Sequence, residues 1–122
     1  MIALFEGGLL AATFGCILAN AFEVVAKIVR AQFVMRNSAE VGVGEKWIPC
    51  LALLEGAGVA GLVIGLAGMP LLGFAAAGGL ALFFVGALLA HVRARVFRNI
   101  AFPAAFLVLA VASAAHFAAL LG

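Results

Sequence analysis

Long stretches of apolar residues alternate with short polar segments along this chain. Apolar side chains dominate residues 2–28, 47–68, 71–92 and 100–121. Each stretch reaches the roughly 20 residues that an α-helix needs to cross a bilayer. The pattern therefore predicts four membrane-spanning helices in a single transmembrane domain of residues 1–122. Because short connections make successive helices antiparallel neighbours, the expected fold is all-α, an integral membrane up-down four-helix bundle.

The segment between the first two spans has its own polar pattern. We expect the first helix to continue past residue 28 through residues 32–35, and Asn37 with Ser38 to break it. Ser38 is then placed to cap a short turn that contains Glu40. Most of the chain is used by the spans, so a functional site is expected among the helices or at their ends.

Basic residues are confined to two short segments, each at the end of a span and in the connection that follows it. None precedes the first of them, none lies between the two groups and none follows the last. Cytoplasmic loops of membrane proteins are enriched in Lys and Arg, so the pattern predicts that both connections are cytoplasmic and both termini are outside, N-out and C-out. The formal charge of +2 is then explained by topology and by anionic headgroups, and no nucleic-acid partner is expected. The seven residues are Lys27, Arg30, Arg36, Lys46, Arg93, Arg95 and Arg98.

Polar residues of the first span follow a helical stripe. Their successive steps are seven, three, four, three and four residues, which place them all on one helix face. A single stripe predicts a polar face that is turned into the bundle and away from lipid. The stripe consists of Glu6, Thr13, Cys16, Asn20, Glu23 and Lys27.

Depth along the helices divides the polar residues into two groups. Counting about 1.5 Å per residue from each helix end places Asn20, Glu23, Lys27, Glu55 and His91 in an inner cluster, which we predict to bind a ligand. Glu6 and His116, with Ser113 nearby, form an outer group.

Glu55 is the deepest of the carboxylates. It either pairs with Lys27 or His91 from another helix, or it is a neutral acid that is free to donate a hydrogen bond. Glu23 and Lys27 are one helical turn apart, so they are also able to neutralise each other without Glu55.

Small and reactive residues add further expectations. Gly61 and Gly65 form a small-x-x-x-small pair, which predicts close helix packing within one bundle or, alternatively, at a homodimer seam. Cys16 and Cys50 are expected at different depths and therefore unpaired. No spacing of His, Cys or Glu matches a metal site. A signal peptide is disfavoured because the first span has Glu6 and no basic residue before it.

Three segments of the chain, at residues 41–58, 82–95 and 99–107, have a characteristic order and spacing. On these segments the chain resembles the DoxX-like family, over about residues 20–115. The resemblance implies a four-helix bacterial membrane protein, here placed in the cytoplasmic membrane. Relatives in the wider DoxX/DoxD group are linked to membrane redox work, including a thiosulfate:quinone oxidoreductase subunit. In that group Lys or Glu is frequent at the position of Glu55, and His at that of His91.

The expected function is that of an accessory subunit without catalytic activity of its own, which binds a small apolar ligand such as a quinone at the inner cluster. Two alternatives remain open. One is a small proton-coupled carrier in which Glu55 titrates during a conformational change. The other is a purely structural partner in a homo-oligomer or a larger membrane complex, where the polar stripe only holds helices together.

Overall fold

Four long helices dominate the structure, a computed structural model that describes all residues 1–122. They are α1 (Ile2–Ile28), α3 (Ile48–Leu66), α4 (Pro70–Ala94) and α5 (Ala101–Leu121), and each is long and apolar enough to cross a membrane. The protein is therefore a multi-pass membrane protein, and its exposed apolar side chains are suited to contact with a lipid bilayer. Four long apolar helices are confirmed, and each begins and ends within two residues of the span expected for it.

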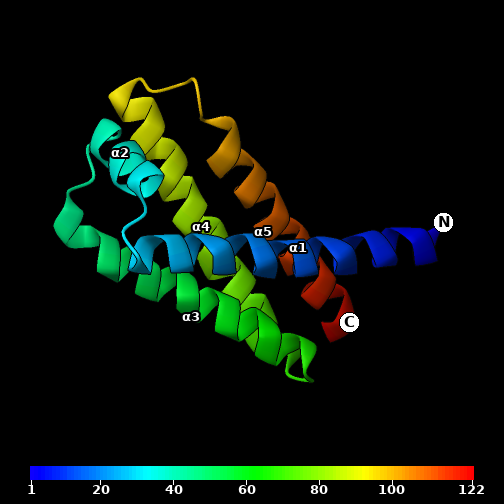
Figure 1. The fold of residues 1–122 in the computed structure, drawn as a ribbon. Coiled ribbons are helices and arrows are strands. Elements are labelled where there is room, and N and C mark those ends of the chain that lie inside the picture. Colours follow the sequence, from blue (N-terminus) through cyan, green and yellow to red (C-terminus); the bar gives the residue numbers. More distant parts are fainter.

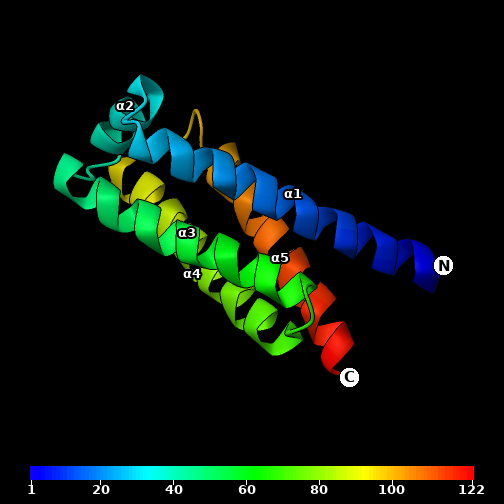
Figure 2. The ribbon, with the colours of Figure 1, turned by 60° about the horizontal axis from the view of Figure 1, so that its bottom comes forward.

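The helices pack as a ring in which each long helix has two neighbours. The neighbouring pairs are α1 with α3, α3 with α4, α4 with α5, and α5 with α1. Figures 1 and 2 show both termini at one end of this bundle and the short helix α2 (Gln32–Glu40) at the other. In the same views the first turns of α1 project beyond the other helices. Residues 1–8 are accordingly all exposed.

The connection between α1 and α3 differs from the prediction. The helix does not continue past residue 28, because Arg30 adopts a left-handed conformation with φ of 56°. The amide of Ala31 bonds the carbonyl of Ala26 at 2.9 Å, and that of Arg30 bonds Lys27 at 3.2 Å, which is the Schellman pattern of helix termination. A second helix, α2, then runs through Asn37 and Ser38 without a break. The prediction of a helix break at Asn37 and Ser38 was therefore wrong.

The same termination pattern ends α4. Arg95 is left-handed with φ of 59°, the amide of Val96 bonds the carbonyl of His91 at 2.9 Å, and that of Arg95 bonds Val92 at 3.1 Å. A left-handed residue other than glycine costs about 1–2 kcal/mol in backbone strain. A cationic side chain after a helix C-terminus is stabilised by the negative end of the helix dipole, which offsets part of that strain.

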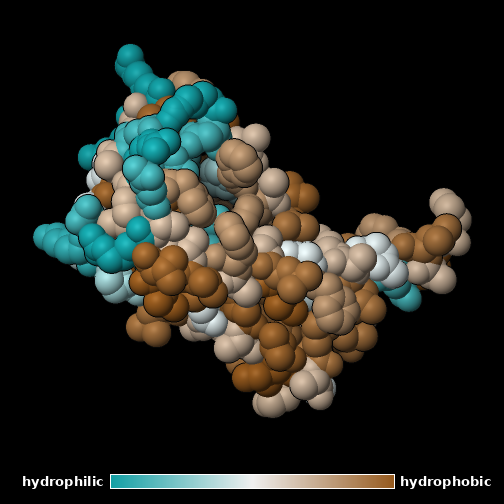
Figure 3. Space-filling model, in the orientation of Figure 1, coloured by the Kyte–Doolittle hydropathy of each residue, from teal (hydrophilic) through white to brown (hydrophobic).

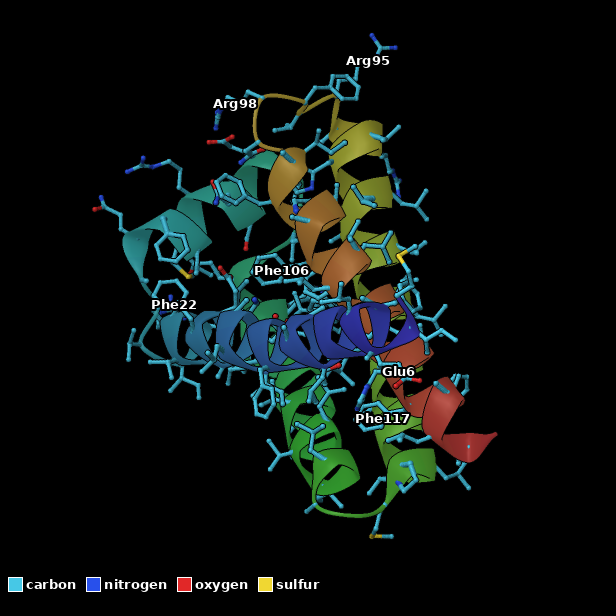
Figure 4. All side chains as sticks on the ribbon, turned by 90° about the vertical axis from the view of Figure 1, so that its right-hand side faces the viewer. Glu6, Phe22, Arg95, Arg98, Phe106 and Phe117 are labelled. Carbon is cyan, nitrogen blue, oxygen red and sulfur yellow. The ribbon has the colours of Figure 1, made fainter.

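All basic residues lie at one end of the bundle, because they belong to the last turns of α1 and α4 or to the connections that follow these helices. Hydrophilic residues accordingly gather over α2 and its surroundings in Figure 3, while apolar residues cover most of the remaining visible surface. Arg95 and Arg98 lie at this end in Figure 4, and Glu6 and Phe117 lie toward the other. This segregation is what the predicted N-out, C-out orientation requires; the orientation itself stays a prediction.

The predicted inward stripe of α1 is confirmed for its central part. Thr13, Cys16 and Asn20 are all fully buried. Thr13 donates to the carbonyl of Leu9 at 2.8 Å, so its hydroxyl is satisfied within its own helix. Cys16 and Cys50 are both free, as expected.

Glycines allow α3 and α4 to pack backbone to backbone. A Cβ atom added at Gly61 would lie 2.5 Å from the Cβ of Ala76, and one at Gly65 would lie 2.5 Å from the Cα of Gly73. Gly73 in turn receives the ring of Phe117 from α5, where a Cβ atom would meet ring carbons at 2.6 Å. The predicted close packing of Gly61 and Gly65 within one bundle is thus confirmed.

The orientation predicts the behaviour of reporter fusions. A C-terminal fusion to a phosphatase that folds only outside the cytoplasm should be active, because the basic connections keep the opposite end inside. A fusion placed in the α4–α5 connection, after Phe97, should be inactive. The reverse pattern of activities would invert the orientation.

The glycine packing predicts a matched pair of stability effects. Gly61→Ala should destabilise the protein by about 1–3 kcal/mol through overpacking against Ala76. Gly79→Ala, on α4, has no atom within 4 Å of the new Cβ and should be neutral or stabilise the helix by up to about 1 kcal/mol. Unfolding in detergent measures both. Equal stabilities of the two variants would contradict the close α3–α4 contact.

Candidate functional site

A lysine at the end of α1 joins carboxylates from two helices. The Nζ atom of Lys27 lies 2.7 Å from Oε1 of Glu55 on α3 and 3.5 Å from Oε2 of Glu23, one turn earlier on α1. The side chain of Glu55 is 0% exposed and that of Lys27 is 12% exposed. The closer contact is therefore the one between helices, and of the two pairings that the sequence left open for Lys27, the structure favours Glu55.

Glu55 is bonded through only one of its carboxylate oxygens. Lys27 donates to Oε1, whereas Oε2 is buried and has no hydrogen-bond partner in the protein. Buried acceptors in folded proteins are nearly always bonded, because leaving one unbonded costs about 1–3 kcal/mol. The free oxygen of Glu55 is therefore an atom whose position needs an explanation.

A cavity of about 500 Å³ lies beside this ion pair. It is formed where the last turns of α1 and α4 and the first turns of α3 and α5 meet α2. Glu23, Lys27, Glu55 and His91 all line it, so the structure brings together four of the five residues predicted for the inner cluster. Six of the eleven phenylalanines also line it, namely Phe22, Phe33, Phe83, Phe84, Phe102 and Phe106.

Asn20 is the predicted residue that the cavity does not include. Its side chain is fully buried one turn before Glu23, and its Nδ2 donates to the carbonyl of Cys16 at 2.8 Å. Its Oδ1 has no partner in the protein. Asn20 therefore belongs to the packed interior next to the cluster and does not line the cavity.

His91 lines the cavity but makes no hydrogen bond to Glu55 or Lys27. Its Nδ1 lies 2.8 Å from the carbonyl oxygen of Ala87, one turn earlier on α4. Because a carbonyl oxygen only accepts, Nδ1 must carry the hydrogen in this contact, and Nε2 of a neutral ring is then an acceptor.

The wall made by α2 is the part of the site that the sequence did not reveal. Phe33, Val34, Asn37 and Ser38 of α2 all line the cavity, and Val34 is buried. The available signal was the alternation of apolar and polar residues in this short segment, which makes α2 amphipathic.

Two contacts hold α2 to the α4–α5 connection. Arg98 forms an ion pair with Glu40, and Nδ2 of Asn99 donates to Oδ1 of Asn37 at 3.5 Å. Asn99 also lines the cavity, and its Oδ1 is buried without a partner. The second basic connection therefore closes one side of the cavity, and Asn99 is a further polar residue that sequence reasoning missed.

The outer polar residues form no comparable site. Glu6 is exposed on the projecting part of α1, and no hydrogen bond or ion pair joins it to His116, which is partly buried on α5. Ser113 is buried and donates to the carbonyl of Leu109 at 2.7 Å. Figure 4 shows Phe22 and Phe106 of the cavity near α2, whereas Glu6 lies toward the opposite end.

Comparisons with known proteins place the fold in a family. Neither the curated proteins nor the solved structures gave a match to this chain. The family model described as the DoxX-like family matches residues 11–113, which include all of α3 and α4, most of α1 and α5, and every residue of the inner cluster. Since that match covers well over half of the sequence, the chain belongs to the DoxX-like family.

Proposed function

We propose that this DoxX-like membrane protein binds a small, largely apolar ligand with a polar head in the cavity beside Lys27 and Glu55. The observation that carries the proposal is the buried Oε2 of Glu55, which has no partner in the protein and belongs to a residue that lines a cavity of about 500 Å³. Ligand sites typically measure about 300–1,000 Å³, with mostly apolar walls and a few convergent polar groups. This cavity has that size and that composition.

The cavity is lined mostly by apolar side chains, with a few polar ones around Glu55. Phenylalanine rings from α1, α2, α4 and α5 supply apolar surface for a ring or a short tail. Glu55, Lys27 and His91 supply polar atoms for the head. A ligand of the quinone class has this division into an apolar ring and polar oxygens. Glu23 contributes by sharing Lys27, and Asn20 by filling the interior behind the cluster.

In this proposal the protein holds and orients its ligand and is an accessory subunit of a redox system in the bacterial cytoplasmic membrane. Its partners would be a larger membrane complex or further copies of the chain, reached through the exposed apolar helix faces. The role is binding because the cluster offers one cation and two carboxylates without a nucleophile beside a base.

The purely structural alternative receives some support from the Lys27–Glu55 pair, which joins α1 to α3 at 2.7 Å. If that were the whole role, the cavity would bind nothing and the pair would serve only stability. Separate variants of the cavity and of the pair distinguish these functions, because the cavity can be filled without touching either charge.

Filling the cavity should abolish binding and leave the fold intact. Gly86 lines the cavity, and a Cβ atom added there would meet no atom within 4 Å. Gly86→Leu should weaken binding of a short-tailed benzoquinone, offered in its oxidised and reduced forms, by at least about tenfold. Titration calorimetry on the full chain in detergent measures the affinity.

The matched control is Gly79→Leu, two turns earlier on α4, where an added Cβ atom also meets no atom within 4 Å and the residue does not line the cavity. This variant should bind like the parent protein. The proposed site is wrong if both forms of the benzoquinone bind the Gly86→Leu variant as tightly as they bind the parent protein. It is also wrong if neither form binds the parent protein or the variant.

Breaking the ion pair should reduce stability. Glu55→Gln leaves Lys27 without its closest carboxylate in a poorly hydrated environment, which should cost about 3 kcal/mol. Lys27→Met combined with Glu55→Gln should recover part of the loss, because no buried charge is then left unpaired. Thermal unfolding in detergent measures all variants. Glu45→Gln, in the exposed pair with Arg30, is the control and should change stability little. A silent Glu55→Gln would show that the pair has no structural role.

A further inference from the structure

The polar atoms without partners at the cavity share one property. Oε2 of Glu55 and Oδ1 of Asn99 are both buried, both belong to residues that line the cavity, and neither has a hydrogen-bond partner in the protein. The amide oxygen of Asn99 can only accept, and so can Oε2 of Glu55 when the carboxylate is ionised and paired with Lys27. A ligand that satisfies them must bring hydrogen-bond donors.

Several donors of the cavity, in contrast, are already engaged. Lys27 donates to Glu55 and faces Glu23 as well. Nδ2 of Asn99 donates to Asn37, and Nδ1 of His91 points to the carbonyl of Ala87. The hydroxyl of Ser38, which also lines the cavity, has no hydrogen-bond partner in the protein and could donate to a ligand. A ligand with acceptors alone would nevertheless leave both unpaired oxygens as they are. This mismatch weighs against the oxidised form of a quinone, whose ring oxygens only accept.

The walls favour an aromatic ligand. Phe22 and Phe33 stack with centroids 6.1 Å apart, and Phe84 contacts Phe83 and Phe106 with centroids 5.0 and 5.1 Å apart. These rings come from α1, α2, α4 and α5, so they surround the cavity on several sides. Aromatic rings pack against one another in stacked or edge-on arrangements, and a ligand ring can take part in the same contacts.

Charge decides between a neutral donor and a cationic one. A protonated amine would also donate to Glu55, and phenylalanine faces attract cations. However, the ammonium of Lys27 already lies 2.7 Å from the same carboxylate. The seven Lys and Arg residues moreover lie at this end of the bundle with only four carboxylates, Glu23, Glu40, Glu45 and Glu55, so the surroundings of the cavity have a net positive charge. A neutral hydroxyl avoids both repulsions.

We infer that the cavity takes a neutral aromatic ligand whose polar head is a hydroxyl donor, a phenol or a hydroquinone, in preference to an acceptor-only quinone or an amine. This inference rests on the proposed function, since it concerns the ligand of the same cavity. It assigns the head group to Oε2 of Glu55 and Oδ1 of Asn99 and the ring to the phenylalanine walls.

Four probes with one ring and one short alkyl tail test the inference. They are a hydroquinone kept under reducing conditions, its quinone, its dimethyl ether, and a benzylamine that is protonated at neutral pH. Titration calorimetry on the full chain in detergent gives each affinity. We expect the hydroquinone to bind at least about tenfold more tightly than each of the other three, the change that one hydrogen bond to a charged acceptor typically supplies.

Variants of the two acceptors assign the selectivity to its atoms. Glu55→Gln should bring the hydroquinone close to the affinity of the dimethyl ether, because the amide oxygen stays with Lys27 and the NH2 group, a donor, replaces Oε2. The quinone should bind this variant at least as tightly as the parent protein. Asn99→Ala should reduce the same preference. Because Asn99 lies outside the buried ion pair, this variant tests the inference even if Glu55→Gln does not fold. Glu45→Gln, an exposed carboxylate outside the cavity, should leave all four affinities unchanged.

The outcomes separate this inference from the proposed function. If the quinone binds as tightly as the hydroquinone or more tightly, the preference for a hydroxyl donor is wrong, and the cavity remains a ligand site. Tightest binding of the amine overturns it in favour of a cation site. Binding of none of the four probes overturns the proposed function and this inference with it.

Discussion

A charged side chain buried among membrane-spanning helices needs a partner of opposite charge inside the protein. The pair of Lys27 and Glu55 satisfies this constraint, and the packing of the bundle depends on it. Glu55 is fully buried on α3, where its own helix has no basic residue, and Lys27 reaches it from the last turn of α1 at 2.7 Å. An unpaired ion in such a place is costly enough to unfold a marginal protein. The pair therefore fixes the rotation of α1 against α3. With that rotation fixed, Thr13, Cys16 and Asn20 must face the interior, because they lie on the same helix face as Lys27.

The two ends of the bundle are packed differently. Near the termini glycines let α3 and α4 pack closely, whereas at the other end the helices surround a cavity. At the end near the termini, Gly61, Gly65 and Gly73 let the helices approach until a single added methyl group would overlap a neighbour. Phe117 of α5 fills the remaining space and is fully buried. At the other end a cavity lies among the helices, and it is lined by the rings of Phe83, Phe84 and Phe106 and by residues of α2.

Much of this arrangement is visible in the sequence, and the rest depends on geometry that a sequence does not contain. The spans follow from hydropathy, and the inward stripe follows from its helical spacing, because both are periodic along the chain. The sequence did not decide which carboxylate pairs with Lys27. Glu23 lies one turn away on the same helix, whereas Glu55 comes close to Lys27 only because α1 and α3 pack together. The end of α1 was also hidden, because Arg30 takes a left-handed conformation that glycine normally marks. The wall formed by α2 and the role of Asn99 depend on that turn, so both were missed together.

Membership of the DoxX-like family accounts for the fold, and the ligand must be argued from the residues of this chain. The strongest argument lies in how Glu55 is bonded. A carboxylate kept only to hold two helices together would be stabilised best with donors on both oxygens, since an unbonded buried acceptor costs more than a hydrogen bond gains. Here one oxygen is bonded to Lys27, and the other is buried without a partner beside a cavity lined by aromatic rings. Departures from full hydrogen bonding concentrate where a protein meets its ligand, because the ligand supplies the missing group. The half-bonded state of Glu55 therefore favours a binding role for the pair in addition to its structural one.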